Sequence, residues 1–361
     1  MTKSIIPLDG IAAERFKTFP ILERLNAASR GLAEFKGIVA TIPNQEILVS
    51  SLAIQEAKDS SEIENIVTTH DEIFREASFP GESANPAAKE VLRYRQALTV
   101  GTRLLAETGL ITNNHIIAIQ AELEQNDAGF RRLPGTKLKD GAGRVVYEPP
   151  QEPAEVLRLM GELERFINGE AGYDADPMIR MALIHHQFES IHPFYDGNGR
   201  TGRIVNVLYL INQGLLDLPV LYMSRYIVRT KSEYYRLLQA VRVDDAWEEW
   251  VTYMLTAVER TAHEGIRLTV AIRDALLDVK HRVRKAHHFY SQDLINYLFS
   301  HPYARIQHLE RELGVSRITA TKYLDRLAAD GILEKMKLGR NSFYINTRLY
   351  GILTEMPRME R

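Results

Sequence analysis

The sequence predicts a mainly α-helical protein with a β-hairpin in its middle and a small helical domain, ending in a second hairpin, at its C-terminus. Apolar residues recur at helical spacing through most of the 361 residues. Short β-prone runs flank glycines at 137–148 and again at 332–345, a pattern typical of hairpins. We therefore divide the chain into four parts: an N-terminal helical region at 1–110, a core at 111–260, a linker helix at 261–285 and a C-terminal domain at 286–361.

The composition is that of an ordinary soluble globular protein, with 45% hydrophobic and 25% charged residues. A net charge of −2 indicates no particular class of partner. The absence of cysteine excludes disulfides, thiol catalysis and thiolate metal sites. The chain starts without an apolar secretory segment and has no run of about 18 apolar residues, so we expect a cytoplasmic protein that does not bind membranes.

The most informative stretch is His-Pro-Phe-Tyr-Asp-Gly-Asn-Gly-Arg-Thr-Gly-Arg at 192–203, which lies between two predicted helices. Apolar residues at helical spacing predict the first helix over 177–190 and a second helix that ends near Gly214. The proline and the Asp-Gly-Asn-Gly run break the helix between them. Residues 197–199 therefore come at the first turn of the second helix, where free N–H groups favour an anion.

Four side chains of this stretch suit nucleotide chemistry. Arg200 and Arg203 are three residues apart on one helical face, so both can reach the same polyphosphate. Asp196 provides one hard carboxylate, and magnesium on a nucleotide usually takes one or two protein carboxylates. A neutral imidazole at His192 can take a proton from an incoming hydroxyl group.

A metal-hydrolase site is the competing interpretation of the same region. His185 and Glu189 are four residues apart on one helical face, with His186 and His192 nearby. The spacing is not His-Glu-x-x-His, and no further set of ligands stands out in the sequence. We therefore expect His185 to be a core histidine and His186 to be partly buried.

The stretch matches without departure the signature His-x-Phe-x-Asp/Glu-Gly-Asn-Gly-Arg-x-x-Arg, and in this the chain resembles the Fic family. Fic enzymes typically transfer AMP from ATP to a protein hydroxyl. The resemblance implies that His192 is the general base, that Asp196 holds Mg²⁺ and that Phe194 seats the loop in the core. It also implies that the rest of the motif binds ATP, through an anion hole followed by two arginines that grip the outer phosphates: Gly197, Asn198, Gly199, Arg200, Thr201, Gly202 and Arg203.

A second match to the family lies upstream of this motif. Many members carry an inhibitory helix with the pattern Ser/Thr-x-x-x-Glu-Gly/Asn, which Ser60, Glu64 and Asn65 fit. A Glu64 carboxylate that pairs with Arg203 would hold the guanidinium meant for the γ-phosphate, and ATP would then bind in a non-productive pose. Ser60 comes one helical turn before Glu64 and would brace the same face.

Two further elements follow from the resemblance. Gly-Phe-Arg-Arg at 129–132 precedes the hairpin at 137–148, as in Fic proteins whose flap holds the target protein as an added strand. The resemblance also suggests an aromatic side chain against the adenine, for which Tyr235 is the candidate and Tyr234 the alternative. A tyrosine at helical spacing is more often part of a core.

The C-terminal part resembles a winged helix-turn-helix domain. Its expected helices lie around 294–298, at 306–313 and, as the recognition helix, at 317–329, before a wing hairpin that turns at 339–341. Between 281 and 348 the chain has twelve Lys and Arg against six Asp and Glu, a net charge of +6, which suits duplex DNA. Many winged helices bind proteins instead, and the expected DNA contacts are Arg317, Thr319, Lys322 and Arg340.

We therefore expect a nucleotidyltransferase, namely a protein adenylyltransferase (AMPylase) that moves AMP from ATP to Tyr, Thr or Ser hydroxyls of target proteins, itself included, and is autoinhibited by Glu64. Three alternatives stay open. The enzyme uses another nucleotide donor or transfers another group, or it removes AMP from a target while Glu64 aligns a water molecule, or the chain is a DNA-binding regulator whose Fic core senses nucleotide. Fic proteins of this layout can also form homodimers.

Overall fold

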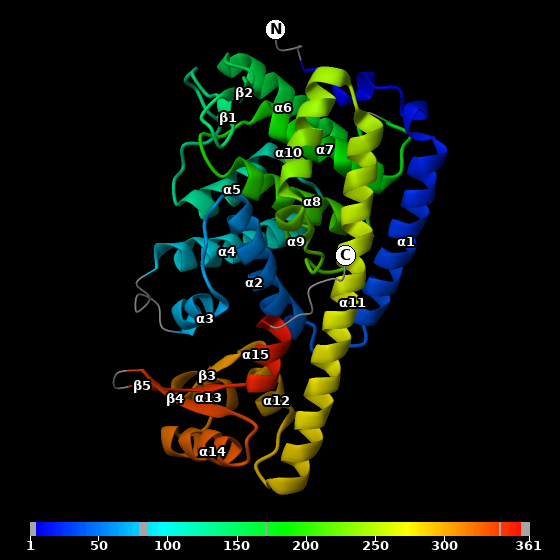
Figure 1. The fold of residues 1–361 in the computed structure, drawn as a ribbon. Helices are drawn as coiled ribbons and strands as arrows, with labels where there is room; N and C mark the ends of the chain where they lie inside the picture. Colours follow the sequence, from blue (N-terminus) through cyan, green and yellow to red (C-terminus); the bar gives the residue numbers. More distant parts are fainter. Residues whose placement is uncertain (1–4, 79–84, 171, 339–340, 355–361) are drawn as a thin grey trace. The chain divides into compact units, whose positions relative to one another are not determined.

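The computed structural model describes residues 5–78, 85–170, 172–338 and 341–354, and these residues are mainly helical (Figure 1). They divide into two compact units that interleave along the chain. None of the described helices is long and apolar enough to span a membrane. The first unit comprises Met1–Lys36, Asp59–Ile66 and Arg93–His263, and the second comprises Gly37–Lys58, Val67–Leu92 and Glu264–Arg361.

The first unit begins with two short 3-10 helices, η1 (Leu8–Gly10) and η2 (Ala13–Phe16). Six α-helices lie wholly within it: α5 (Asn113–Glu124), α6 (Pro153–Ile167), α7 (Pro177–Ile191), α8 (Asn198–Asn212), α9 (Ser224–Arg229) and α10 (Lys231–Asp244). Four longer helices contribute part of their length: α1 (Phe19–Val39), α2 (Glu46–Ile63), α4 (Pro86–Thr108) and α11 (Trp247–Ala286). Helix α11 runs without a break through residue 260, where the sequence suggested that the core closes.

Helix α7 is the centre of this unit. It packs against α6 and α8, and every residue from Met178 to Ile191 except Arg180 is buried. Trp250 of α11 is fully buried beside it and donates a hydrogen bond from its indole nitrogen to the Ala182 carbonyl oxygen at 2.8 Å. A helix enclosed on all sides gives a rigid base to the loop that follows it.

Helices α7 and α8 begin and end close to the predicted residues. The Asp176 side chain caps α7 by accepting a hydrogen bond from the Met178 N–H at 2.8 Å. At the other end His192 adopts a left-handed backbone with φ of +49°, which stops the helix. Gly197, with φ of +76°, then starts α8 in a conformation that glycine adopts at little cost.

The predicted hairpin at 137–148 is present in the first unit. Its strands β1 (Leu138–Lys139) and β2 (Val145–Tyr147) pair antiparallel, with Leu138 opposite Tyr147. Asp140 closes the turn, because its Oδ1 accepts hydrogen bonds from the N–H groups of Ala142 and Arg144, each at 2.9 Å. We call this hairpin the flap.

The second unit holds the C-terminal elements: α12 (Gln292–Ser300), β3 (Tyr303–Arg305), α13 (Ile306–Leu313), α14 (Arg317–Ala329), β4 (Glu334–Leu338), β5 (Asn341–Ile345) and α15 (Thr347–Thr354), together with α3 (His70–Ser78). The strands form an antiparallel sheet in the order β3-β5-β4. Helices α13 and α14 span the predicted ranges, whereas the sequence did not predict β3. Residues 339–340 of the expected wing turn, and with them Arg340, lie outside the described residues.

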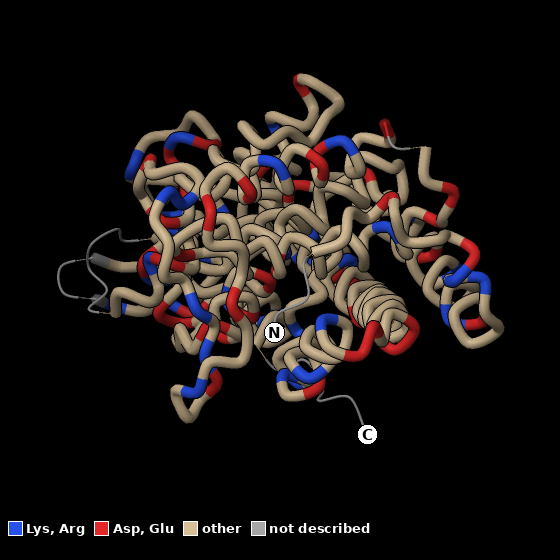
Figure 2. The backbone as a smooth tube through the Cα atoms, turned by 90° about the horizontal axis from the view of Figure 1, so that it is seen from above, with Lys and Arg blue, Asp and Glu red and all other residues tan. Residues whose placement is uncertain are grey.

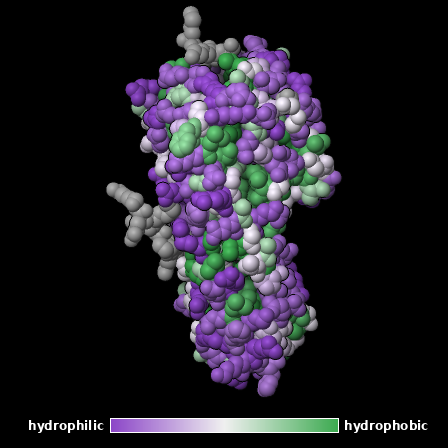
Figure 3. Space-filling view, turned by 90° about the vertical axis from the view of Figure 1, so that its right-hand side faces the viewer, coloured by the Kyte–Doolittle hydropathy of each residue, from purple (hydrophilic) through white to green (hydrophobic). Residues whose placement is uncertain are grey.

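Charged residues of both signs are spread along the backbone. Figure 2 shows Lys and Arg interspersed with Asp and Glu, in keeping with the net charge of −2. The face seen in Figure 3 is mostly hydrophilic, with hydrophobic residues in small separate areas. Against this mixed background, the charge of +6 over residues 281–348 is a local excess.

Candidate active site

The loop between α7 and α8 is fixed to the core at two points. Phe194 is fully buried, and its ring centroid lies 5.2 Å from that of Phe130. Asn198 brackets the same residue, because its side chain accepts a hydrogen bond from the Phe194 N–H and donates one to the Phe194 carbonyl oxygen, both at 2.9 Å. Phe194 thus takes the anchoring position expected from the sequence, and the Asn198 side chain holds the backbone of Phe194 in place.

Arg131 holds the other side of the loop. Its side chain is 2% exposed. Its Nε donates to the carbonyl oxygen of His192 at 2.8 Å and its Nη2 to that of Ile191 at 3.3 Å. Its backbone N–H donates to the Pro193 carbonyl oxygen at 2.8 Å. The Gly-Phe-Arg run indicated this segment, but only the structure shows that a buried guanidinium binds the backbone carbonyl groups at the start of the loop.

The Glu64 carboxylate lies against the start of helix α8. Its Oε1 accepts a hydrogen bond from Nη2 of Arg203 at 3.0 Å. The same oxygen is so close to Gly199 that a Cβ atom at residue 199 would be 2.3 Å from it. A helix N-terminus and an arginine both favour an anion. A carboxylate therefore stands where the sequence predicts a phosphate.

Ser60 and Asn65 flank this contact. Arg203 donates from Nε to Ser60 Oγ at 2.8 Å and from Nη2 to the Ser60 carbonyl oxygen at 2.9 Å. Asn65 has a left-handed backbone with φ of +63°, which only Gly and a few residues such as Asn adopt readily. This explains physically why the pattern places Gly or Asn after the glutamate. The Asn65 side-chain oxygen also accepts a hydrogen bond from Lys231 Nζ at 2.9 Å.

A second carboxylate, Glu124 at the end of α5, pairs with the other arginine of the motif. Its Oε1 accepts a hydrogen bond from Nη2 of Arg200 at 2.7 Å, and the Glu124 and Arg200 side chains are 15% and 5% exposed. The same oxygen would be 2.6 Å from a Cβ atom at Gly197. No signal in the sequence points to Glu124, because 76 positions separate it from Arg200 and it belongs to no local pattern. Both arginines of the motif are therefore paired with carboxylates.

We expect Glu124→Ala to lower the free energy of unfolding by about 3 kcal/mol, because the buried Arg200 loses its carboxylate. Urea unfolding followed by circular dichroism measures the change. The double variant Glu124→Leu/Arg200→Leu removes both charges and should recover most of the loss. If the single and double variants lost the same free energy of unfolding, the effect would be due to packing rather than to an unpaired charge.

The imidazole of His192 is held in its neutral form. Burial, and then the guanidinium groups of Arg242 and Arg131, lower its pKa to about 4. The imidazole is therefore uncharged at neutral pH, which is the form that accepts a proton. Its Nδ1 is buried and has no hydrogen-bond partner among the residues that the structure describes.

Glu189 is a buried acid beneath the motif. Burial raises its pKa to about 7, although the Arg203 guanidinium acts in the opposite direction. Its Oε1 has no hydrogen-bond partner within the described part of the chain and would be 3.3 Å from a Cβ atom at Gly202. The sequence suggested Glu189 only as a metal ligand, because burial and the proximity of Arg203 are properties of the folded chain.

We expect stability to fall as the pH drops from 6.5 to 5. Burial lowers the pKa of His185 to about 3 and of His192 to about 4, and lowers that of His186 as well, so unfolding takes up protons below pH 6.5. Glu189, whose pKa is raised in the folded protein, releases a proton on unfolding and so offsets one of the three protons that the histidines take up. The free energy of unfolding should decrease by about 2 kcal/mol per pH unit in this window, measured by urea unfolding at each pH.

A suitable control is His281→Gln, which changes an exposed histidine and should leave this pH slope intact. His192→Asn should reduce the slope, since one of the protons is no longer taken up. A free energy of unfolding that stays constant between pH 6.5 and 5 would contradict the burial of neutral imidazoles.

Asp196 is the exposed carboxylate of the loop. Its Oδ1 accepts a hydrogen bond from the Gly197 N–H at 2.7 Å. Within the described ranges, no group of three His, Cys, Asp or Glu side chains could hold a metal ion. The role of Asp196 as a Mg²⁺ ligand stays a prediction from the sequence, in which phosphate and water would supply the remaining ligands. The metal-hydrolase alternative finds no ligand set in the same residues.

The neighbouring tyrosines of α10 differ in their surroundings. Tyr234 is 2% exposed, and its Oη lies 2.8 Å from Nε2 of His185. Tyr235 is 45% exposed and stands edge-on to Tyr234, with the ring centroids 5.2 Å apart. Tyr235 is thus the one that can contact a ligand. His185 is a core histidine, as expected, and His186 is more fully buried than expected, at 4% exposed.

Thr201 and Gly202 face the core rather than the start of the helix. Thr201 is fully buried, and a Cβ atom at Gly202 would be 3.0 Å from Cδ1 of Phe188 on α7. Gly202 therefore allows α8 to pack closely on α7. Within the predicted ATP-binding run, Gly199 and Arg203 are the residues that face the Glu64 carboxylate.

Comparison with known families gives three matches along the chain. The model described as Fic/DOC family N-terminal matches residues 22–103, and the Fic/DOC family model matches residues 110–210. The model for the C-terminal domain of SoFic-like protein adenylyltransferases matches residues 276–349. The first two matches contain the Glu64 segment and the 192–203 motif, respectively.

Curated relatives match over a shorter range. A protein adenylyltransferase fic-1 from Caenorhabditis briggsae is 32% identical over 145 residues, which is 38% of this chain and 26% of the relative. The protein adenylyltransferase Fic from Drosophila melanogaster is 31% identical over 112 residues, which is 31% of this chain and 21% of the relative. The match therefore spans about a quarter of these relatives' own length.

Solved structures with the same fold cover more of the chain. A Fic family protein from Desulfovibrio desulfuricans superposes with a TM-score of 0.59 at 20% identity, over 91% of this chain and 96% of that one. A fragment of Fic-1 from Caenorhabditis elegans gives a TM-score of 0.52 at 21% identity, over 68% of this chain and 71% of that one. At 20% and 21% identity these similarities show a shared fold, and residues 22–103 and 110–210 carry the sequence signatures of the Fic/DOC family.

Proposed function

We propose that this protein is an adenylyltransferase that moves AMP from ATP to Tyr, Thr or Ser hydroxyls of target proteins, its own included. The observation that carries the proposal is the anion site at the start of α8, where Gly199 and Arg203 surround a carboxylate. Backbone N–H groups and a guanidinium at one point suit a phosphate chain better than a neutral ligand. The names of the relatives from Caenorhabditis and Drosophila support the same activity.

In the proposed reaction, the target oxygen attacks the α-phosphorus of ATP. The bond between this phosphorus and the oxygen that bridges to the β-phosphate breaks, so that AMP is joined to the target and pyrophosphate leaves. His192, neutral because of its lowered pKa, accepts the proton of the attacking hydroxyl group. Arg131 keeps the loop backbone closed around this residue, so the ring has little freedom to move.

The negative charge of the departing pyrophosphate needs stabilisation. Arg203 and the first N–H groups of α8 would contact the outer phosphates once Glu64 has moved away. Asp196 would hold Mg²⁺, which neutralises charge on the phosphates when it is bound. Tyr235, exposed on α10, would lie against the adenine.

The flap would bind the target protein. It has only two strands, so each of them lacks a second neighbouring strand among the described residues, and an extended target segment can add to an edge. Val145 and Val146 of β2 are 50% and 44% exposed. A cavity of about 770 Å³ adjoins this strand and is lined in part by Ile6 and Val243. Apolar side chains of the target would fit this cavity.

Labelled ATP tests the proposal. We would incubate the Glu64→Gly variant with Mg²⁺ and ATP labelled at either the α- or the γ-phosphate, and measure label bound to protein. Label from the α position alone supports AMP transfer, whereas label from the γ position would indicate a kinase. Nucleotide binding without any label would favour another donor, removal of AMP or a purely regulatory role.

A further inference from the structure

We propose that the C-terminal elements α12 to β5 bind duplex DNA, with helix α14 in the major groove and strand β4 beside the phosphate backbone. Helices α13 and α14 are joined by a turn of three residues at 314–316. Gly314 has a left-handed backbone with φ of +61°, and Ser316 caps α14 by accepting a hydrogen bond from the Thr319 N–H at 3.2 Å. This is the arrangement in which the second helix of a helix-turn-helix pair reads DNA.

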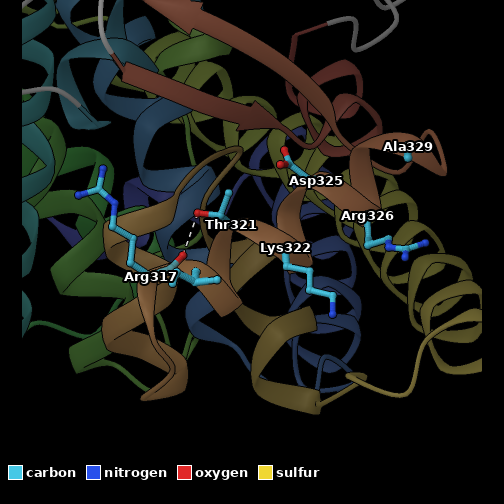
Figure 4. A pocket seen from close by; sticks show the side chains of 7 residues that line it. Arg317, Thr321, Lys322, Asp325, Arg326 and Ala329 are labelled. Atoms are coloured by element: carbon cyan, nitrogen blue, oxygen red, sulfur yellow. Dashed lines mark hydrogen bonds between the residues drawn. The ribbon is translucent and has the colours of Figure 1, made fainter.

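Helix α14 has a clear inner and outer face. Ala320, Leu324 and Leu327 are fully buried, at the spacing of one helical face. The outer face carries cations and lines a depression of about 710 Å³ (Figure 4). The residues that line it are Arg317, Ile318, Thr321, Lys322, Asp325, Arg326 and Ala329.

The charge on this outer face is available to a partner. Arg317, Lys322 and Arg326 are exposed, and none of them has an ion-pair partner among the residues that the structure describes. Asp325, the acid in the depression, is already engaged, because it accepts hydrogen bonds from Lys335 Nζ at 2.6 Å and from Tyr344 Oη at 2.7 Å. The face therefore presents three cations whose charge is not balanced by a neighbouring carboxylate, as a polyanion requires.

The apolar content of the face also suits DNA better than a protein partner. Ile318, the second residue of α14, is 82% exposed. An aliphatic side chain near the start of a recognition helix can contact the methyl group of thymine, and Thr321, one turn further on, can reach base or phosphate oxygens. The lining of the depression contains no aromatic residue, although aromatic anchors usually dominate protein interfaces.

Strand β4 adds a second basic element. It carries Lys335 and Lys337, and Lys337 is exposed. In this arrangement Ile318 and Thr321 of the helix would face base edges, and the cations of the helix and of the strand would contact the sugar-phosphate backbone. The net charge of +6 over 281–348, in a chain with a net charge of −2, indicates that the basic character is concentrated in this part of the sequence.

The test uses the full-length protein and a fluorescent pool of random duplexes of about 25 base pairs, with binding followed by anisotropy at about 50 and about 200 mM salt. We expect wild-type protein to bind and to weaken as salt rises. The triple variant Arg317→Ala/Lys322→Ala/Arg326→Ala should bind at least about tenfold more weakly, with a salt slope smaller by about one unit for each lost phosphate contact. Because all three residues are exposed, the thermal midpoint should stay close to that of the wild type.

The matched control removes the same charge elsewhere. The variant Arg103→Ala/Arg158→Ala/Arg236→Ala changes three partly exposed arginines of the first unit and should bind DNA as the wild type does. Absence of salt-sensitive binding by the wild type, or equal binding by the two triple variants, would overturn the proposal. Neither measurement involves ATP, so the result is independent of the proposed enzymatic activity.

Ile318→Ala tests the orientation of the helix. After selection of preferred duplexes from the random pool, this variant should lose preference at one or two base pairs while it keeps most of its affinity for unselected DNA. An unchanged sequence preference would place α14 outside the major groove and contradict the proposed docking.

Discussion

Glu64→Gly is expected to raise AMP transfer by about 10- to 100-fold, because it removes the carboxylate from the anion site. The Glu64 hydrogen bond to Arg203 is charge-assisted and shielded on the arginine side, where only 2% of the side chain is exposed. Such contacts contribute roughly 1.5–3 kcal/mol, and about 1.4 kcal/mol corresponds to a tenfold change in rate. The initial rate of α-labelled ATP incorporation measures the effect.

Two comparisons make this result specific to the Arg203 contact. Glu34→Gly introduces glycine in place of an exposed glutamate on α1, as Glu64→Gly does at the site, and should leave the rate unchanged. Glu64→Gln keeps the size and a neutral hydrogen bond, so its rate should lie between those of the wild type and Glu64→Gly. A Glu64→Gly variant no more active than the wild type would show that the carboxylate does not limit the reaction.

His192→Asn in the Glu64→Gly background is expected to reduce AMP transfer by about 10²- to 10⁴-fold, the usual contribution of a general base. Asparagine tolerates the left-handed backbone at this position, where φ is +49°, better than most residues do. The fold and the anion site should therefore survive. Single-turnover rates with saturating ATP isolate the chemical step from nucleotide binding.

The affinity for ATP provides the control for this variant. Calorimetry should give similar dissociation constants with and without His192, because Arg203 and the start of α8, not the imidazole, contact the phosphates in the proposed complex. A variant that loses ATP binding together with activity would assign His192 a structural role. One that keeps more than a tenth of the activity would indicate a different base.

The sequence was sufficient for the elements with local signals. The spacing of apolar residues, Pro177 and Gly214 predicted the two helices that flank the motif, and the structure confirms their ranges within a few residues. The motif itself indicated where an anion would bind. The contact of Ser60 and Glu64 with Arg203 could be predicted although the two segments are far apart along the chain, because each of them matches a family pattern. Helix α14 at 317–329 was likewise marked by Ser316 at its start and Gly331 after its end.

What the sequence could not provide are contacts between distant segments without a pattern. The Glu124–Arg200 pair and the three bonds from Arg131 to the loop join residues about 60 to 80 positions apart. The raised pKa of Glu189 likewise depends on burial, which only the packed helices determine. Strand β3 has three residues and pairs with β5 some forty positions later, so its own sequence carries almost no signal.

The close approach of Glu64 to Gly199 limits which substitutions could separate inhibition from activity. A side chain at residue 199 would expel the glutamate, since its Cβ atom would be 2.3 Å from Oε1, but it would also fill the space that a phosphate needs. Under the proposed function, a side chain at residue 199 would therefore relieve the inhibition only together with a loss of activity. Glu64→Gly removes the carboxylate and leaves the start of α8 unchanged, so the proposed inhibition can be lifted from outside the motif.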